Sequence, residues 1–166
     1  MKKLFRVCIG LLAVAPIAGL TYLFAFMMGK QQAVQRLGGV VTQYAKLFQQ
    51  FFPPTISKAS EFDLFKEKVK PQHPLYKVWS LLYDYPVEYP DDDSVLLVIK
   101  NCPFSDALKM LKLPEFGEYM CQGDWEVARE NSHKWRFERT GTIGTGCEVC
   151  DFWYIRIRQT NTSSNR

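Results

Sequence analysis

The sequence predicts an α+β domain, with an antiparallel sheet and helices packed on one face of it, preceded by an N-terminal transmembrane helix. Two observations support this prediction. Segments with strand and helix periodicity follow each other in the order strand–strand, helix–helix, strand–strand, which is typical of an antiparallel sheet covered by helices. An apolar run near the N-terminus is long enough to cross a membrane. We expect an anchor at residues 1–29, the α+β domain at 30–158 and a flexible tail at 159–166.

Length and charge limit the classes of protein to which the chain can belong. Its 166 residues suffice for one domain with a core, and its 14% aromatic content argues against disorder. The formal net charge is +4, but Lys2, Lys3 and Arg6 precede the apolar run, so the rest of the chain is nearly neutral. Without a basic stripe, this charge does not indicate nucleic-acid binding.

The apolar run contains no charged residue from Val7 to Met28. A helix over this run would be roughly 30 Å long, the thickness of a hydrocarbon core. A single-pass membrane anchor is our preferred interpretation, and a cleaved signal peptide and a buried helix of the domain stay open as alternatives. The basic cluster before the run slightly favours a cytoplasmic N-terminus, which would place the domain on the non-cytoplasmic side.

Two helices are expected between the apolar run and the first strand. In residues 30–52 apolar side chains recur at spacings of three and four, which predicts an amphipathic helix that ends before Pro53. It either packs on the domain or continues the membrane helix as a stalk or dimerising helix. A shorter helix is predicted from Ser60 to Lys70, stopped by Pro71.

The periodicity then changes from helix to strand. Residues 76–87 are rich in aromatic and β-branched side chains, and residues 95–99 form a continuous apolar run. We therefore expect a β-hairpin with 95–99 as an inner strand. The three aspartates at 91–93 predict a solvated turn, because the alternating ligands and terminal Glu of a calcium loop are missing.

Two further helices and two strands are expected in the C-terminal half. Ser105 is predicted to cap one helix, and Pro114 to open another that runs towards Asn131. Alternating side chains over residues 135–140 and 152–158 predict two strands. The glycine-rich segment 141–146 between them forms either a hairpin loop or an anion cradle.

Two of the cysteines in this half lie close to an aspartate, in the pairs Cys121 with Asp124 and Cys150 with Asp151. A thiol near a carboxylate is a candidate nucleophile with a candidate base, or half of a metal site. Packing of Cys150 in the core and a surface position for Asp124 are the structural alternatives. Asp151, set among Cys, Phe and Trp, should be buried and partnered if it points inward, with Arg139 on the neighbouring strand as its natural partner.

Cys147 and Cys150 form a Cys-x-x-Cys pair, a spacing found in zinc sites and redox sites. Zinc would need two more ligands at spacings that the chain does not offer in a familiar pattern. The pair precedes a strand and does not open a helix, so the usual lowering of a redox thiol pKa is missing. We expect no metal and no cofactor, and we keep a thiol redox or metal-binding protein as an alternative.

The order of short motifs from Val95 to Arg158 resembles the L-2-amino-thiazoline-4-carboxylic acid hydrolase family. The motifs are Cys102-Pro103-Phe104, the segment Cys121 to Asp124, Arg139 with Gly141-Thr142-Ile143, and Cys150-Asp151-Phe152. The resemblance implies hydrolysis of a small cyclic C–N/C–S compound such as 2-amino-thiazoline-4-carboxylate. Attack would fall on the amidine-like carbon between ring sulfur and ring nitrogen.

The resemblance also implies roles for individual residues. Cys150 or an activated water would be the nucleophile, with Cys121 as a rival, and Asp151 or Asp124 would be the acid/base. Arg139 would bind the substrate carboxylate through its two-pronged donor geometry. Thr142 and Cys102 would complete the substrate-binding residues.

The main expectation is therefore a membrane-anchored hydrolase-like protein. A catalytically inactive ligand-binding or sensing module of the same fold, serving as a subunit at a membrane, is the first alternative. The expected partners are a small-molecule substrate or ligand, a membrane contacted through residues 7–28, and a second copy or a larger membrane assembly.

Overall fold

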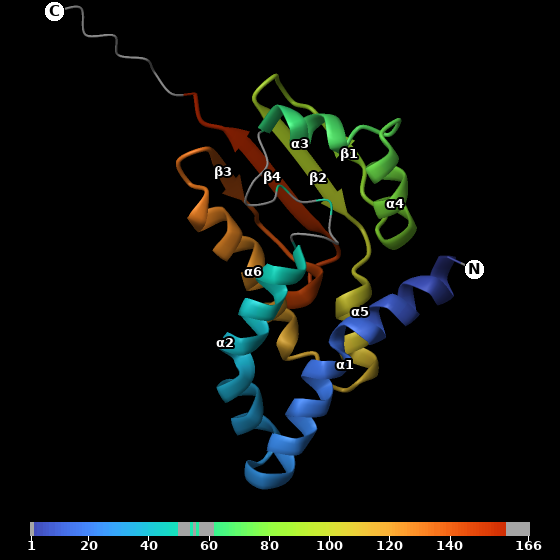
Figure 1. Ribbon diagram of the computed structural model, residues 1–166, viewed down its shortest axis with the longest axis vertical. Helices are drawn as coiled ribbons and strands as arrows, with labels where there is room; N and C mark the ends of the chain where they lie inside the picture. The colour runs from blue at the N-terminus through green and yellow to red at the C-terminus, as the bar shows by residue number, and fades with distance from the viewer. Residues whose placement is uncertain (1, 50–53, 55, 57–61, 159–166) are drawn as a thin grey trace, which may run out of the picture.

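The computed structural model describes residues 2–49, 54, 56 and 62–158, and it shows helices together with a four-stranded antiparallel sheet (Figure 1). The sheet order is β1-β2-β4-β3, and every neighbouring pair is antiparallel. The strands are β1 (Val87–Glu88), β2 (Ser94–Ile99), β3 (Trp135–Glu138) and β4 (Cys150–Arg156). The helices are α1 (Lys2–Met28), α2 (Lys30–Gln49), α3 (Phe62–Lys68), α4 (Pro74–Leu82), α5 (Pro103–Met110), α6 (Phe116–Glu130) and the 3-10 turn η1 (Ile143–Thr145). The predicted α+β class is confirmed.

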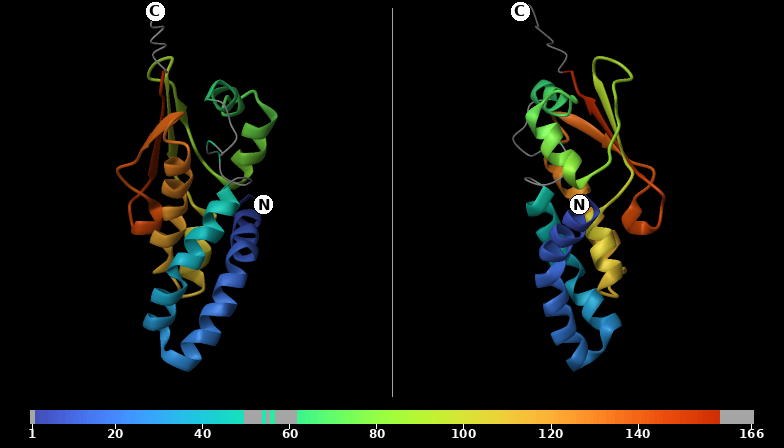
Figure 2. Two further views of the ribbon diagram at one scale, coloured as in Figure 1. Left: turned by 60° about the vertical axis from the view of Figure 1, so that its left-hand side comes forward. Right: turned by 90° about the vertical axis from the view of Figure 1, so that its right-hand side faces the viewer.

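Helices bury one face of the sheet. Phe137, Phe152 and Tyr154 share that face, because alternate residues of a strand point to the same side. Phe65 of α3 meets the ring of Tyr154 at 4.9 Å, and Trp125 of α6 meets the ring of Phe137 at 5.0 Å. In Figure 2, left, the sheet is seen nearly edge-on with α3 and α4 to one side of it. On the opposite face the strand residues other than Ser94 are half-buried or exposed, so one face carries the core.

The long helix α1 packs along α2 and α5. Gly29, with φ +87°, makes the turn from α1 into α2, a conformation that favours glycine. At Gly10 an added Cβ would overlap the carbonyl of Pro103, so α1 lies directly on the first turn of α5. The Nε of Arg6 donates to the carbonyl of Leu81 at 2.9 Å, which ties the start of α1 to α4. The helix α1 is long enough and apolar enough to cross a membrane. Signal sequences and buried helices of soluble proteins can have the same length and composition.

The hairpin predicted over residues 76–87 and 95–99 is confirmed in its inner strand, because β2 lies between β1 and β4, but its first strand is wrong over most of residues 76–87. Pro74 to Leu82 form α4, and the strand β1 that pairs with β2 has only two residues. The reason lies at the start of α4, where Pro74 occupies the first turn and the Nδ1 of His73 accepts the N–H of Leu75 at 3.1 Å. Aromatic residues fit either structure, and the local cap decides in favour of the helix.

The predicted cap at Ser105 is also wrong. Pro103 begins α5, and the Sγ of Cys102 accepts the N–H of Ser105 at 3.5 Å, so Ser105 lies inside the helix. The other predicted segments agree with the structure to within a few residues, and α6 continues through Gly123 to Glu130. The proposed ends at residues 50–53 and 60, and the tail at 159–166, lie outside the described residues.

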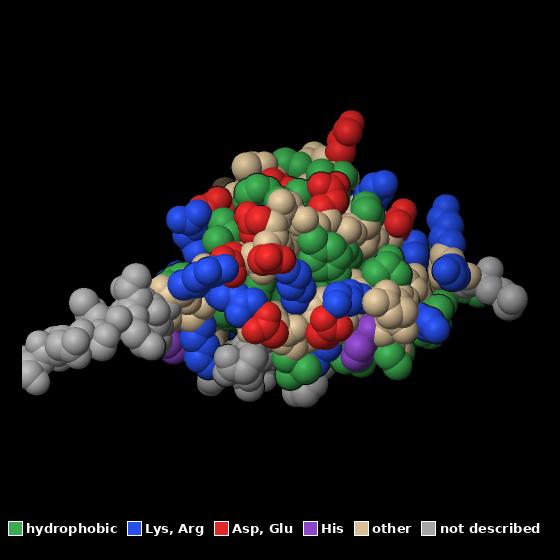
Figure 3. Space-filling model, turned by 90° about the horizontal axis from the view of Figure 1, so that it is seen from above, with side chains coloured by type: hydrophobic (Ala, Val, Ile, Leu, Met, Phe, Trp, Pro, Cys, Tyr) green, Lys and Arg blue, Asp and Glu red, His purple; other side chains and the backbone are tan. Residues whose placement is uncertain are grey.

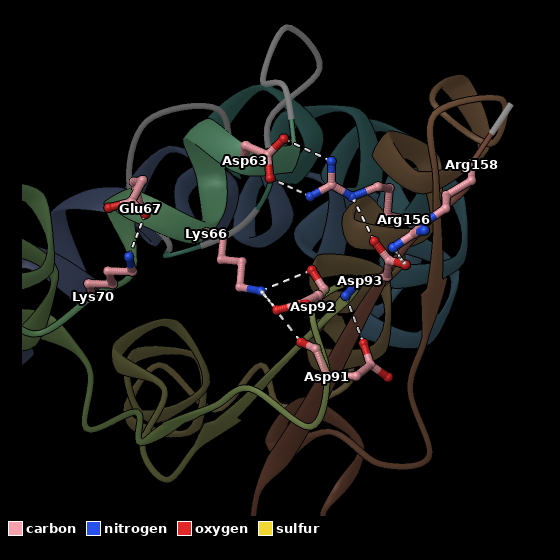
Figure 4. Close-up of polar contacts among 9 residues, drawn as sticks. All are labelled: Asp63, Lys66, Glu67, Lys70, Asp91, Asp92, Asp93, Arg156 and Arg158. Atoms are coloured by element: carbon pink, nitrogen blue, oxygen red, sulfur yellow. Dashed lines mark hydrogen bonds and ion pairs between the residues drawn. The ribbon is translucent and has the colours of Figure 1, made fainter.

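The turn predicted at Asp91 to Asp93 is confirmed and is held by ion pairs. The N–H of Asp93 donates to Asp91 Oδ1 at 2.8 Å, and Asp93 also meets Arg158 at 2.7 Å. Arg156 joins this turn to Asp63 of α3 (Figure 4). Acidic and basic side chains are mixed over this end of the molecule (Figure 3). Exposed pairs of this kind contribute little to stability, so we assign them to orienting α3 over β4.

Candidate functional site

A cavity of about 70 Å³ lies where α2, α5, α6 and β4 meet. Such a volume exceeds the roughly 10–15 Å³ that one water needs, so the cavity has room for a small organic group. Its walls are mainly apolar, and they carry three thiols, one carboxyl, one phenol hydroxyl and one side-chain amide. The lining residues are Ala45, Phe48, Gln49, Tyr83, Ile99, Cys102, Phe104, Met120, Cys121, Asp124, Cys150 and Phe152.

A larger open groove of about 670 Å³ runs along α6 and β3. Among its described lining residues there is no cysteine, aspartate or glutamate. Of these two hollows, the small cavity is the one that carries thiols and a carboxyl group.

Three elements each bring one thiol to the cavity. Cys102 stands at the N-cap of α5, Cys121 lies in the second turn of α6, and Cys150 is the first residue of β4. The predicted site residues Cys102, Cys121, Cys150 and Asp124 are thus brought together, although they are far apart in the sequence. Within the described part of the chain, no group of three or more His, Cys, Asp or Glu residues has the geometry of a metal site.

Burial keeps these thiols protonated at neutral pH. It raises the pKa of Cys150 to about 12, against the opposing effect of the hydrogen bond from the N–H of Ile143 to Cys150 Sγ at 3.2 Å. Burial raises the pKa values of Cys102 and Cys121 as well. A thiol in this cavity therefore needs a base to become a nucleophile.

The carboxyl group of Asp124 lies in a buried ion pair. Asp124 Oδ2 accepts from Arg139 Nη1 at 2.7 Å, and the two side chains are 7% and 8% exposed. Burial raises the pKa of Asp124 to about 7, although Arg139 acts to lower it. An acid with a pKa near neutrality is suited to exchanging protons with a substrate. The structural alternative for Asp124, a surface position on the helix, is wrong.

Arg139 is fixed by contacts around its guanidinium group. It donates to the carbonyl of Cys121 at 3.1 Å, and its Cζ lies 5.5–5.8 Å from the ring centres of Trp125, Phe137 and Phe152. The expectation that Arg139 pairs with Asp151 is wrong, because its carboxylate partner is Asp124. Arg139 also lies behind the cavity wall and is not among its lining residues.

Asp151 points away from the cavity. Cys150 and Phe152 line the cavity, so strand alternation turns Asp151 to the other face of β4. Its carboxylate accepts the N–H groups of Thr140 at 3.1 Å and Gly141 at 2.8 Å and the hydroxyl of Thr140 at 2.6 Å. Burial acts to raise the pKa of Asp151, but these hydrogen bonds outweigh it and hold that pKa below its ordinary value. Asp151 is thus half-buried, and its partners are those of a loop anchor instead of the expected Arg139.

The loop before β4 packs against α6 through two glycines. A Cβ on Gly117 would overlap the carbonyl of Gly144, and a Cβ on Gly144 would overlap Cys121 Sγ. The side chain of Thr142 accepts the N–H of Thr145 at 3.2 Å and also hydrogen-bonds to Cys121. Thr142, predicted to bind substrate, thus lies behind Cys121 and outside the cavity lining. The loop forms the 3-10 turn η1, closed by Gly146 at φ +99°.

Cys147 and Cys150 are separated by the fold. Cys147 is exposed in the loop, whereas Cys150 is buried at the cavity, and both are free thiols in the structure. The two thiols therefore do not lie on one surface.

Tyr83 is a cavity residue that the sequence did not indicate. It caps the C-terminus of α4, is 3% exposed, and has a buried hydroxyl without a hydrogen-bond partner among the described residues. Burial and the nearby Cys102, Asp124 and Cys150 raise its pKa well above the ordinary value. Because residues 76–87 had been assigned to a strand, no pattern singled out this tyrosine.

Comparison with known proteins identifies the family. The chain matches the family model of L-2-amino-thiazoline-4-carboxylic acid hydrolase over residues 22–154, which is most of its length. No curated protein matches the chain. The matched region contains every residue of the cavity and the Asp124–Arg139 pair. The chain belongs to the L-2-amino-thiazoline-4-carboxylic acid hydrolase family.

Proposed function

We propose that this protein hydrolyses a small cyclic C–N/C–S compound such as 2-amino-thiazoline-4-carboxylate in the cavity between α2, α5, α6 and β4. The observation that carries the proposal is the presence of Asp124, with a pKa of about 7, in the same cavity as three protonated thiols. This combination supplies an acid/base and candidate nucleophiles to one small, mostly apolar site.

Asp124 is assigned the first proton transfer. In its ionised form it accepts a proton from the thiol of Cys150 or from a water in the cavity, and the resulting nucleophile bonds to the amidine carbon while the C=N electron pair moves to the nitrogen. One ring bond at that carbon then breaks as the C=N bond re-forms, and the departing ring atom takes the proton from Asp124. Where Cys150 is the nucleophile, a water deprotonated by Asp124 then attacks the same carbon, the bond from that carbon to the Cys150 sulfur breaks, and the thiol takes the proton back. Arg139 does not take part in this transfer; it orients the Asp124 carboxyl group through the 2.7 Å contact.

A ligand-binding module without catalysis is the second candidate. It is favoured by the raised pKa values of all three cavity thiols, which keep them in the less nucleophilic protonated form. A binding module needs the cavity but no reactive group, so turnover separates the two functions.

The test measures hydrolysis by the full chain, which is kept intact because α1 packs on α5. The protein is purified in detergent under reducing conditions. Loss of 2-amino-thiazoline-4-carboxylate is followed for the wild type, Cys150→Ala and the exposed-cysteine control Cys147→Ala. We expect turnover by the wild type and by the control. Loss of turnover in Cys150→Ala identifies the thiol of Cys150 as nucleophile, and retained turnover assigns the attack to Cys121 or to water. A folded wild type that leaves the substrate intact removes the hydrolase proposal in favour of the binding module.

We further propose that α1 attaches the protein to a membrane. Its inner face carries small residues against the domain, whereas its outer face exposes large apolar side chains to solvent. Burying such side chains in a lipid phase gains about 25 cal/mol per Å². The Gly10 contact with Pro103 keeps the inner face docked, which favours attachment through the outer face. The exposed residues are Leu4, Phe5, Leu12, Leu20, Tyr22, Leu23, Phe26 and Met27.

Vesicle flotation checks this attachment. The wild-type chain should float with phosphatidylcholine vesicles, and the double variant Leu12→Glu, Phe26→Glu should stay largely unbound, because carboxylates on the outer face oppose insertion. Ile157→Ser, which removes an exposed apolar side chain after β4, should float like the wild type. A wild-type chain that remains at the bottom of the gradient contradicts the proposal.

A further inference from the structure

The hydroxyl of Tyr83 is an unsatisfied polar group at the cavity. Its side chain is almost fully buried, and among the described lining residues it is the one whose buried oxygen or nitrogen finds no hydrogen-bond partner. A buried hydroxyl without a partner is costly, so native structures keep few of them and commonly for a functional reason. This hydroxyl is available to a bound ligand.

The backbone around Tyr83 is fixed on both sides. The N–H of Tyr83 donates to the carbonyl of Trp79 at 2.8 Å, which closes α4. The side-chain amide of Asn101 donates to the carbonyl of Leu82 at 2.8 Å and accepts the N–H of Asp84. Asn101 directly precedes Cys102, so one residue joins the position of the tyrosine to the position of a cavity thiol. The hydroxyl is thereby held at the cavity wall.

The cavity also contains a hydrogen-bond acceptor, the carboxyl group of Asp124. Its Oδ2 is taken by Arg139. Tyr83 and Asp124 interact electrostatically across the cavity, which places a donor and an acceptor on the walls of one small space. A cyclic amidine has the matching edge, because its ring nitrogen accepts a hydrogen bond and its exocyclic amine donates one.

We propose that Tyr83 donates a hydrogen bond to the ring nitrogen of a cyclic amidine while Asp124 accepts from its exocyclic amine, so that Tyr83 determines specificity for this ligand class. The inference rests on the proposed function and specifies which part of the substrate the cavity recognises, namely the amidine edge. No Lys or Arg is among the described lining residues. The amidine edge therefore enters the cavity, and a carboxylate on the ligand is not the group bound inside it.

The experiment measures binding by titration calorimetry and by shift of the unfolding midpoint, with the full chain in detergent. The probes are 2-amino-thiazoline, which has the amidine edge and no carboxylate, and thiazolidine, which lacks that edge. Tyr83→Phe keeps the ring and removes the hydroxyl. We expect the wild type to bind 2-amino-thiazoline in preference to thiazolidine. We expect Tyr83→Phe to bind it about tenfold more weakly without a lower unfolding midpoint.

Tyr85→Phe is the matched control. Tyr85 is equally buried, but its hydroxyl donates to the carbonyl of Tyr76 at 3.2 Å and lies outside the cavity. This variant should lose stability and bind 2-amino-thiazoline like the wild type. Equal binding by the wild type and Tyr83→Phe overturns the proposal, and so does a wild type that fails to prefer 2-amino-thiazoline. Hydrolysis of 2-amino-thiazoline-4-carboxylate is measured in parallel, so binding without turnover removes only the hydrolase proposal.

Discussion

Replacing Arg139 by leucine is expected to lower the free energy of unfolding by about 3–5 kcal/mol, because it leaves Asp124 buried without its partner. The same change removes the hydrogen bond to the carbonyl of Cys121 and the contacts with three aromatic rings. Chemical denaturation of the full chain at pH 7 measures the effect. Arg129→Leu is the control. Arg129 pairs with Glu126 on α6, the helix that also carries Asp124, but its side chain is exposed, so this substitution should lower the free energy of unfolding by less than about 1 kcal/mol.

The loss caused by Arg139→Leu should grow as pH rises above 7. The pKa of Asp124 in the folded chain is about 7, above that of an unfolded aspartate, so its contribution to stability is greatest at low pH and is lost as pH rises through 7. Without Arg139 that pKa rises further, and the variant goes on losing stability at pH values where the wild type no longer does. Adding Asp124→Leu should recover part of the loss, because an apolar pair leaves no charge unpaired. A loss that is independent of pH and not recovered would contradict a buried charged pair.

Much of the fold could be predicted from local sequence patterns. The strands β2 and β4 were predicted because both segments are short and rich in β-branched or aromatic residues. Residues 95–99 of β2 form a continuous apolar run, and side chains of different character alternate along β4. The helix α4 was missed because its aromatic side chains are also common in strands. The cap that decides between the two structures is formed by His73, a residue type with no strong capping preference.

The site was predicted in part, and the limit is set by tertiary packing. Short motifs pointed to Cys102, Cys121, Asp124 and Cys150, which the fold brings to one cavity. The partner of Arg139 could not be predicted, because it depends on how α6 crosses β3. Tyr83 comes from an element that is held by residues distant in the sequence, Arg6 of α1 and Asn101, and nothing in its neighbours along the chain indicates this.

Replacing Asp124 by asparagine is expected to lower kcat/KM for 2-amino-thiazoline-4-carboxylate by about 10²–10⁴-fold, the usual contribution of a positioned acid/base. Asparagine keeps an oxygen that can accept from Arg139, so the fold should be retained while proton transfer is lost. The wild-type kcat/KM should rise with pH through about 7, because the ionised carboxyl group is the form that accepts the proton. In Asp124→Asn this inflection should be missing from the residual rate.

Asp151→Asn is the decisive comparison, because the sequence alone made Asp151 and Asp124 equal candidates for the acid/base. Asp151 faces away from the cavity and accepts hydrogen bonds from Thr140 and Gly141. Its variant should lose stability in the loop before β4 but keep the rise of kcat/KM near pH 7. If Asp151→Asn abolished that rise and Asp124→Asn preserved it, proton transfer would belong to the loop and not to the cavity. The position of the rise also links the two predictions, since Arg139→Leu should move it to higher pH by raising the pKa of the same carboxyl group.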